Sequence, residues 1–129
     1  GSISEGGTSI ATVTSVEFTL ENGIEPLFSV GSQTTNRPSI GRSRVTGTLT
    51  TYFASKTLYE KFLNETSSSI TLTLTDLDGN SYEFDFDNVK YNSGQPDVSG
   101  EGAVTIAMDF VALYDGTSDT QLKITRTDA

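Results

Sequence analysis

The sequence predicts a mainly β protein: an antiparallel β-sandwich or barrel of six to seven strands, with one short α-helix on its flank. Two patterns carry this prediction. Apolar and polar residues alternate with a period of two over several segments, which is typical of strands that bury one face. One segment, at about residues 55–65, has helical spacing instead, and a lone helix most simply covers an open side or end of such a fold.

The chain of 129 residues has the size of one domain. Residues 1–10 are rich in Gly and Ser and predict a flexible lead-in, so we place a single β domain at residues 11–127. The Gly1-Ser2 start is typical of a cloning scar, which favours an excised domain.

The first strand is predicted from Ala11 to about Leu20, and Asn22-Gly23 after it is a strong turn signal. A short apolar piece follows at residues 27–30. The polar segment Ser32–Gly41 contains Gly and Pro and predicts a long loop. Loops of that length without regular structure are often functional or disordered.

The densest apolar pattern lies between residues 42 and 74. Val45, Leu49 and Phe53 share one face of a strand, and Ser55 is placed to cap a helix after it. The next strand begins near Ser68. The predicted apolar stripe of the helix consists of Leu58, Tyr59, Phe62 and Leu63.

The second half predicts a hairpin centred near Asp78-Gly79, with Tyr82, Phe84 and Phe86 facing inward. Asn92–Gly102 predicts a second long loop. The longest strand is expected at residues 103–114, with Val104, Ile106, Met108 and Phe110 facing inward, and a final strand is expected at residues 122–126.

Composition excludes several classes of function. The chain has no Cys and no His, which removes the commonest ligands of transition metals and the commonest general base. A net charge of −9 argues against a free nucleic-acid binder, which needs a basic surface. No apolar run is long enough to span a membrane.

Asp76, Asp78 and Asn80 alternate like the first half of a calcium-binding loop. Asp87 stands at the twelfth position, where such a loop requires Glu, and the flanks are predicted strands. The alternative interpretation is a hairpin turn, which favours the same residue types. We therefore predict no metal and no cofactor.

Glu83, Asp85 and Asp87 project from one face of a predicted strand. Paired carboxylates at such spacing are compatible with a glycosidase, but catalysis requires unlike environments that separate their pKa values. The alternative is a solvated acidic face. The long loops hold further polar side chains that are candidates for contacts between subunits: Gln33, Arg37, Arg42, Arg44, Gln95 and Asp97.

Several phrases of the sequence resemble the tail tube proteins of long-tailed bacteriophages. They run in order from about Ser15 to Arg126, and each is a strand, turn or helix phrase rather than a catalytic motif. The phrases are Phe18–Ile24, Gly41–Thr50, Leu58–Asn64, Asp76–Tyr82 and Phe110–Asp115.

The resemblance implies a structural virion protein, similar also to the tube proteins of type VI secretion, without enzymatic activity. It implies rings of six-fold or pseudo-six-fold symmetry, stacked around a channel that passes DNA without binding it specifically. Tail terminator, tape measure and distal tail proteins would be further partners, and the chain would be made in the host cytoplasm. Some relatives carry two tandem domains, of which this would be the second.

Glu83, Asp85 and Asp87 become candidates for the lining of that channel, because an acidic lining repels DNA and keeps passage fast. The alternative function is a β-sandwich binding module, such as a carbohydrate-binding or adhesin domain, and a glycosidase fragment is a third interpretation.

Overall fold

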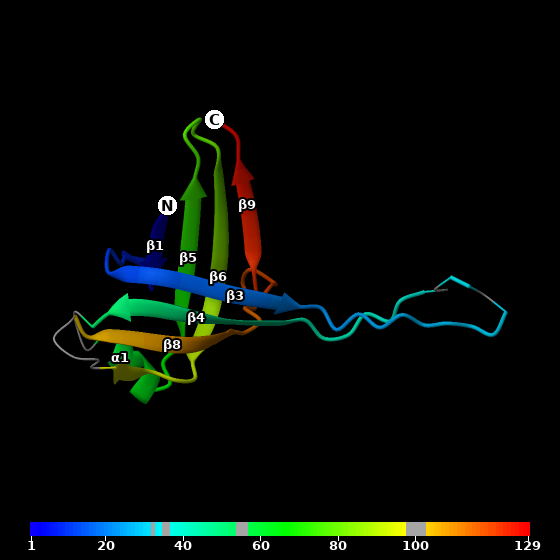
Figure 1. The fold of residues 1–129 in the computed structure, drawn as a ribbon, viewed down its shortest axis with the longest axis horizontal. Helices are drawn as coiled ribbons and strands as arrows, with labels where there is room; N and C mark the ends of the chain where they lie inside the picture. Colours follow the sequence, from blue (N-terminus) through cyan, green and yellow to red (C-terminus); the bar gives the residue numbers. More distant parts are fainter. Residues whose placement is uncertain (32, 35–36, 54–56, 98–102) are drawn as a thin grey trace.

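The computed structural model describes residues 1–31, 33–34, 37–53, 57–97 and 103–129. In these residues the strands form one open antiparallel sheet in the order β2-β1-β5-β6-β8-β4-β3, with β7 beside β8 and β9 beside β6 (Figure 1). The elements are β1 (Ser2–Glu5), β2 (Thr8–Ser9), β3 (Val13–Glu21), β4 (Arg44–Tyr52), α1 (Thr57–Leu63), β5 (Ser68–Thr75), β6 (Ser81–Tyr91), β7 (Gln95–Asp97), β8 (Thr105–Ala112) and β9 (Lys123–Thr127).

The sheet bends into two layers whose strands cross. In Figure 1 the strands β5, β6 and β9 run upright, and β3, β4 and β8 run across them. Strand β6 belongs to both layers, because residues 81–85 pair with β9 and residues 89–91 pair with β8. The predicted mainly antiparallel β fold with one short helix is therefore confirmed, as an open sheet with more strands than the six or seven expected.

A β-bulge in β6 keeps its apolar side chains on the core side through the bend. Phe86 pairs with Ile70, and Val89 pairs with Ser68, so β6 uses one residue more than β5 over this stretch. Phe86 and Val89 are both fully buried. Val89 is three residues after Phe86, so with regular pairing and no bulge it would face the opposite side of the sheet.

Aromatic side chains join the two layers. The ring of Phe18 on β3 lies 5.5 Å from that of Phe84 and 5.2 Å from that of Phe86, measured between centroids. Phe86 in turn contacts Phe110 on β8 at 5.7 Å. Gly47 on β4 makes room for this ring, because a Cβ there would lie 2.5 Å from the Phe110 ring. The buried apolar core consists of Val45, Leu49, Ile70, Phe86, Val89, Tyr91, Ile106, Met108, Phe110 and Ala112.

The helix is shorter than the predicted segment 55–65, and the predicted cap, Ser55, lies outside the described residues. Tyr59 and Phe62 pack against the core, as expected. The prediction that Leu63 joins their apolar stripe is wrong, because Leu63 is 58% exposed at the last residue of α1.

The amino-terminal segment is structured where the sequence predicted a flexible lead-in. All four residues of β1 pair with β5, from Ser2 opposite Thr73 to Glu5 opposite Ile70. Gly6 and Gly7 both have positive φ, which is the geometry that a two-residue turn between twisted strands requires. This turn lets β2 pair with β1, so the segment forms strands and is not a flexible lead-in.

Three further expectations need correction. Asn22-Gly23 does not reverse the chain, and residues 27–30 form no strand and are exposed. The longest strand is β6, with 11 residues, while β8 has 8. The second predicted loop, Asn92–Gly102, contains β7, and its residues 98–102 lie outside the described part of the chain.

Phe62 provides a test of how much the helix contributes to stability. Its side chain is only partly buried against the core, so Phe62→Ala is expected to lower the free energy of unfolding by about 3 kcal/mol, the lower end of the range for such changes. Leu63→Ala is the matched control on the exposed side of the same helix and should change it by less than about 0.5 kcal/mol. Urea denaturation of both variants measures the difference, and equal midpoints would show that α1 contributes nothing.

Candidate functional site

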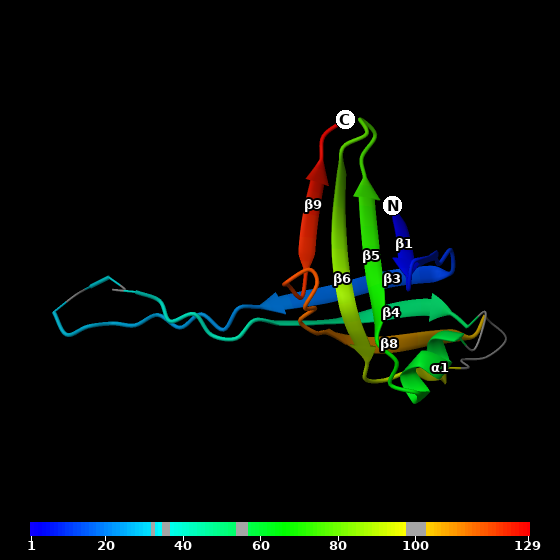
Figure 2. The ribbon, with the colours of Figure 1, turned by 180° about the vertical axis from the view of Figure 1, so that it is seen from behind.

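The most prominent feature outside the core is the segment of residues 22–43, whose described residues (22–31, 33–34 and 37–43) form a two-stranded arm that extends the β3–β4 ribbon away from the body (Figures 1 and 2). Gly41 N donates to Gly23 O at 3.0 Å, and Glu25 and Ser39 exchange two backbone hydrogen bonds of 3.1 and 2.9 Å. Gly23 has a φ of 55°, a conformation that glycine adopts without strain. The sequence predicted a loop here, and the structure makes it a projecting hairpin.

The arm exposes apolar side chains that its own chain does not cover. Phe28 is 69% exposed and Ile40 is 82% exposed, and the complete set is Ile24, Leu27, Phe28, Val30 and Ile40. Of the predicted contact residues, Gln33 and Arg37 lie exposed on the arm, and Arg42 and Arg44 lie exposed at its base. Exposed apolar clusters of this kind mark surfaces that bind another molecule.

The layer that contains β1, β5, β6 and β9 ends in two strands with unpaired backbone. Among the described residues, β9 pairs only with β6. Strand β1 pairs with β5 on one side. On the other side Ser4 and Glu5 pair with β2, and Ile3 O accepts from Ile10 N at 3.0 Å, which leaves Ser2 and the outer side of β2 open. Such edges offer rows of backbone donors and acceptors to a strand from another chain.

The outer face of this layer carries the predicted acidic residues. Glu83 lies opposite Thr73, whose hydroxyl donates to a Glu83 carboxylate oxygen at 3.5 Å. Asp85 lies between Thr71 on β5 and Lys123 on β9. The exposed Asp87 follows in the bulge. Tyr82 lies on the core side of β6, as expected, but it is not buried. Strand β3 does not cover it, and it is 46% exposed.

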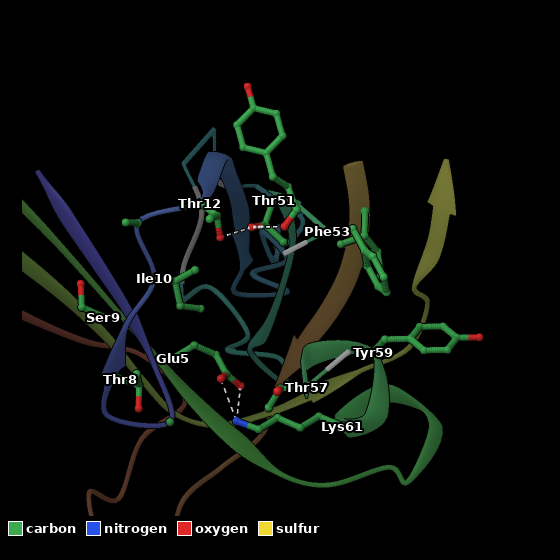
Figure 3. Close-up of a pocket in the computed structure, with 14 residues that line it drawn as sticks. Glu5, Thr8, Ser9, Ile10, Thr12, Thr51, Phe53, Thr57, Tyr59 and Lys61 are labelled. Atoms are coloured by element: carbon green, nitrogen blue, oxygen red, sulfur yellow. Dashed lines mark hydrogen bonds and ion pairs between the residues drawn. The ribbon is translucent and has the colours of Figure 1, made fainter. Parts of the chain in front are cut away.

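A pocket of about 370 Å³ lies at the other end of the β3–β4 ribbon from the arm (Figure 3). Phe53 and Tyr59 form one wall, and Ile10 points in from the segment between β2 and β3. The hydroxyls of Thr12 and Thr51, 2.9 Å apart, lie on another side.

An ion pair between β1 and α1 forms the floor of this pocket. The Lys61 ammonium donates to both carboxylate oxygens of Glu5, at 2.8 and 2.7 Å, and to the Ser68 hydroxyl at 3.0 Å. Glu5 is 6% exposed. The Tyr91 hydroxyl lies 3.4 Å from the same carboxylate, and burial, with the negative charge of Glu5, raises the pKa of Tyr91 well above its usual value. Tyr91 is therefore a neutral donor at neutral pH.

The candidate calcium loop is organised by its own hydrogen bonds. One Asp76 oxygen accepts from the backbone amides of Asp78 and Asn80, and the other accepts from the Asn80 side chain, all at 2.9 Å. The side-chain bond from Asn80 is the main cause that lowers the pKa of Asp76. This arrangement is that of an Asx-type turn. Within the described residues, no three acidic side chains gather as they would around a metal ion.

The comparisons with known proteins decide between the remaining interpretations. A family model described as phage tail tube protein matches residues 1–112, which is most of the chain. This chain belongs to the phage tail tube protein family. No curated protein sequence matches it. It is thus a structural subunit of a tail tube, as the sequence indicated.

Solved structures share the fold of this tail tube protein at low sequence identity. A tail protein of an empty gene transfer agent particle, refined with C6 symmetry, is 12% identical with a TM-score of 0.63, covering 91% of this chain and 84% of its own. The sheath–tube complex of an extracellular contractile injection system, called PVC, contains a chain that is 17% identical at 0.67, covering 98% and 88%. The SPP1 tail tube is 11% identical at 0.60, covering 99% and 77%.

Sequence reasoning missed two features of this tail tube protein. The Glu5–Lys61 ion pair joins residues 56 positions apart, and Glu5 stood in a segment expected to be flexible. The signal that was available is Gly6-Gly7, a two-residue turn between short polar segments. Gln95 and Asp97 lie in β7, so they belong to a strand and not to an open loop.

No helix of the described residues is long and apolar enough to cross a membrane.

Removing divalent metal is expected to leave the tail tube protein unchanged. The three hydrogen bonds to Asp76 satisfy its carboxylate without an ion, so melting temperatures with excess calcium and with a chelator should agree within about 1 °C. Asp76→Ala should lower the melting temperature equally in both conditions, because it removes the turn and not a ligand. A calcium-dependent rise in the parent that Asp76→Ala abolishes would establish a metal site.

Proposed function

We propose that copies of this protein close into rings of six-fold or pseudo-six-fold symmetry and that the rings stack into a tube whose channel passes DNA. The proposal places the protein in the virion tail, after synthesis in the host cytoplasm, and gives it no catalytic role. Tail terminator, tape measure and distal tail proteins would meet the tube at its ends or in its channel.

The observation that carries the proposal is the pair of open edges on the layer formed by β1, β5, β6 and β9. Strand β9 is unpaired on one side of this layer, and the short strand β2 together with Ser2 of β1 forms the open edge on the other side. Pairing the β9 edge of one copy with the β1 edge of the next continues the sheet from copy to copy. Because the two edges differ, the contact is heterologous, and a fixed rotation per copy closes it into a ring.

The acidic outer face of this layer is proposed to line the channel. Glu83 and Asp85 project from the side of β6 opposite Phe84 and Phe86, which pack in the core. The other face of the layer packs against the core, so only this outer face can line a channel. Its side chains are Ser, Thr and carboxylates, with Lys123 among them. A lining of this composition attracts no phosphate backbone, which favours passage over binding.

The arm is proposed to hold successive rings together. It projects beyond the body, carries apolar side chains that the body does not cover, and has cationic residues at its base. Those features suit a contact with another copy, because the rest of the chain is strongly acidic.

Shortening the arm tests its role in stacking. Replacing residues 24–40 by an Asn-Gly turn closes the hairpin where Gly23 and Gly41 already share a hydrogen bond, so the body should fold with a melting temperature within about 5 °C of the parent. The variant is expected to remain as monomers or single rings in negative-stain micrographs, while the parent forms tubes. Tubes of normal length from the shortened protein would remove the arm from the stacking contact.

Charge reversal tests the placement of the acidic face. Phage that carry Glu83→Lys, Asp85→Lys and Asp87→Lys together are expected to assemble tails of normal length but to eject DNA more slowly, because six copies would add eighteen positive charges to the lining. Glu17→Lys together with Glu21→Lys on β3, outside the proposed lining and the arm, forms the control. Normal ejection from the first variant, with intact tubes, would place the acidic face outside the channel.

A further inference from the structure

We infer that the pocket beside α1 is the receptor for the arm of a second copy, with Phe28 as the side chain that enters it. This inference rests on the proposed stacking of rings and assigns the two surfaces that meet. Neither surface is completed within one copy: the arm holds its apolar residues in solvent, and the pocket is an opening in the body.

The pocket has the size and lining for one large apolar side chain with its backbone. Its volume is about 370 Å³, and Phe53, Tyr59 and the inward-pointing Ile10 supply apolar walls (Figure 3). Phe53 is 37% exposed, so a ring that enters would cover apolar surface that is now in water. Aromatic rings that meet at an edge or a tilt gain further attraction.

The polar floor of the pocket is already satisfied and so does not require a charged ligand. Lys61 and Glu5 neutralise each other, and the hydroxyls of Thr12 and Thr51 bind one another. An entering group therefore faces no unpaired charge, and an apolar side chain is accepted without leaving one behind. This chemistry favours Phe28 over the arm's arginines as the group that enters.

The positions of the arm and the pocket favour a contact between copies that propagates. The arm begins where β3 ends and β4 starts, and the pocket is built at the start of β3 and the end of β4. A nine-residue ribbon therefore separates them by about 30 Å, and the arm points away from the pocket (Figures 1 and 2). No copy reaches its own pocket, and two copies related by head-to-tail translation bring arm and pocket together.

Charge supports a second copy of this chain as the occupant. The arm, residues 22–43, holds two basic side chains and one acidic side chain, a net charge of +1, so the rest of the chain carries −10. A positively charged arm is attracted to the negatively charged body of another copy.

A second uncovered apolar surface is the competing receptor. Leu74, Tyr82 and Ile124 lie on the core side of β5, β6 and β9, in the part of the layer that β3 does not cross, and each is about half exposed. It is a flat sheet face without walls, so it offers a single ring less buried area than the pocket does. Cross-linking of the arm to Tyr82 rather than to Ile10 would identify this surface as the receptor.

Cysteine cross-linking tests the inference directly, because the chain has no native cysteine. Phe28→Cys and Ile10→Cys are prepared as separate full-length proteins, mixed under assembly conditions and oxidised. The mixture is expected to give a disulfide-linked dimer on a non-reducing gel, and each variant alone should stay monomeric. Phe28→Cys mixed with Tyr82→Cys is the control for the competing surface and should give no dimer.

A second pair of variants tests the pocket without cysteine. Ala11→Trp fills the opening from an exposed position and should raise the critical concentration for tube assembly at least about thirtyfold, the scale of a lost hot spot. Ala11→Ser at the same position should leave it unchanged. Melting curves confirm that both variants are folded.

The outcomes separate the two proposals. Tubes from the parent, no dimer with Ile10→Cys and normal assembly of Ala11→Trp would overturn the pocket as receptor and leave stacking intact. A disulfide-linked dimer of Phe28→Cys with Tyr82→Cys, and none with Ile10→Cys, would assign the arm to the competing surface. A parent that forms no tubes at all would overturn the stacking proposal and this inference with it.

Discussion

The fold depends on β6 pairing in two layers at once. Its first half lies between β5 and β9, and its last three residues pair with β8, so the strand must turn from one layer into the other. The extra residue at positions 87–88 allows this turn, because it restores Val89 and Tyr91 to the side that Phe84 and Phe86 already occupy. A strand with strict alternation would have to expose one of these pairs.

The surfaces that we assign to assembly follow from the crossing of the layers. Because β3 and β4 run across β5, β6 and β9, the two ends of their ribbon project past opposite sides of the body. One end continues into the arm, and the other meets β1, β2 and α1 around the pocket. The same crossing leaves the outer face of β5, β6 and β9 uncovered, where Glu83 and Asp85 lie. Helix α1 closes the core at the pocket end only.

The sequence predicted what depends on local alternation and missed what depends on partners distant in the chain. The inward faces of Ile106, Met108 and Phe110 follow from a period of two, and the structure confirms them. The exposure of Tyr82 could not be predicted, because it is decided by where β3 crosses and not by the alternation in β6. The sequence predicts a loop for the arm because its few apolar residues lack a regular period, and the pairing of Glu25 with Ser39, 14 positions apart, leaves little local signal. The burial of Glu5 could not be predicted either, because its partner Lys61 lies 56 positions away in the chain.

A contact between an arm and a pocket at opposite ends of one ribbon has a consequence for tube length. Each copy that uses its arm still presents an empty pocket, and each copy that fills its pocket still presents an arm, so every added ring recreates the surface that bound it. The proposed stacking contact therefore sets no end to growth, in contrast to the proposed ring contact between β9 and β1, which is satisfied once the circle closes. A tube of defined length therefore requires other proteins: one that measures during growth, and one that covers the last free arms or pockets. In the proposed assembly the ring contact sets the diameter of the tube, and proteins other than the subunit set its length.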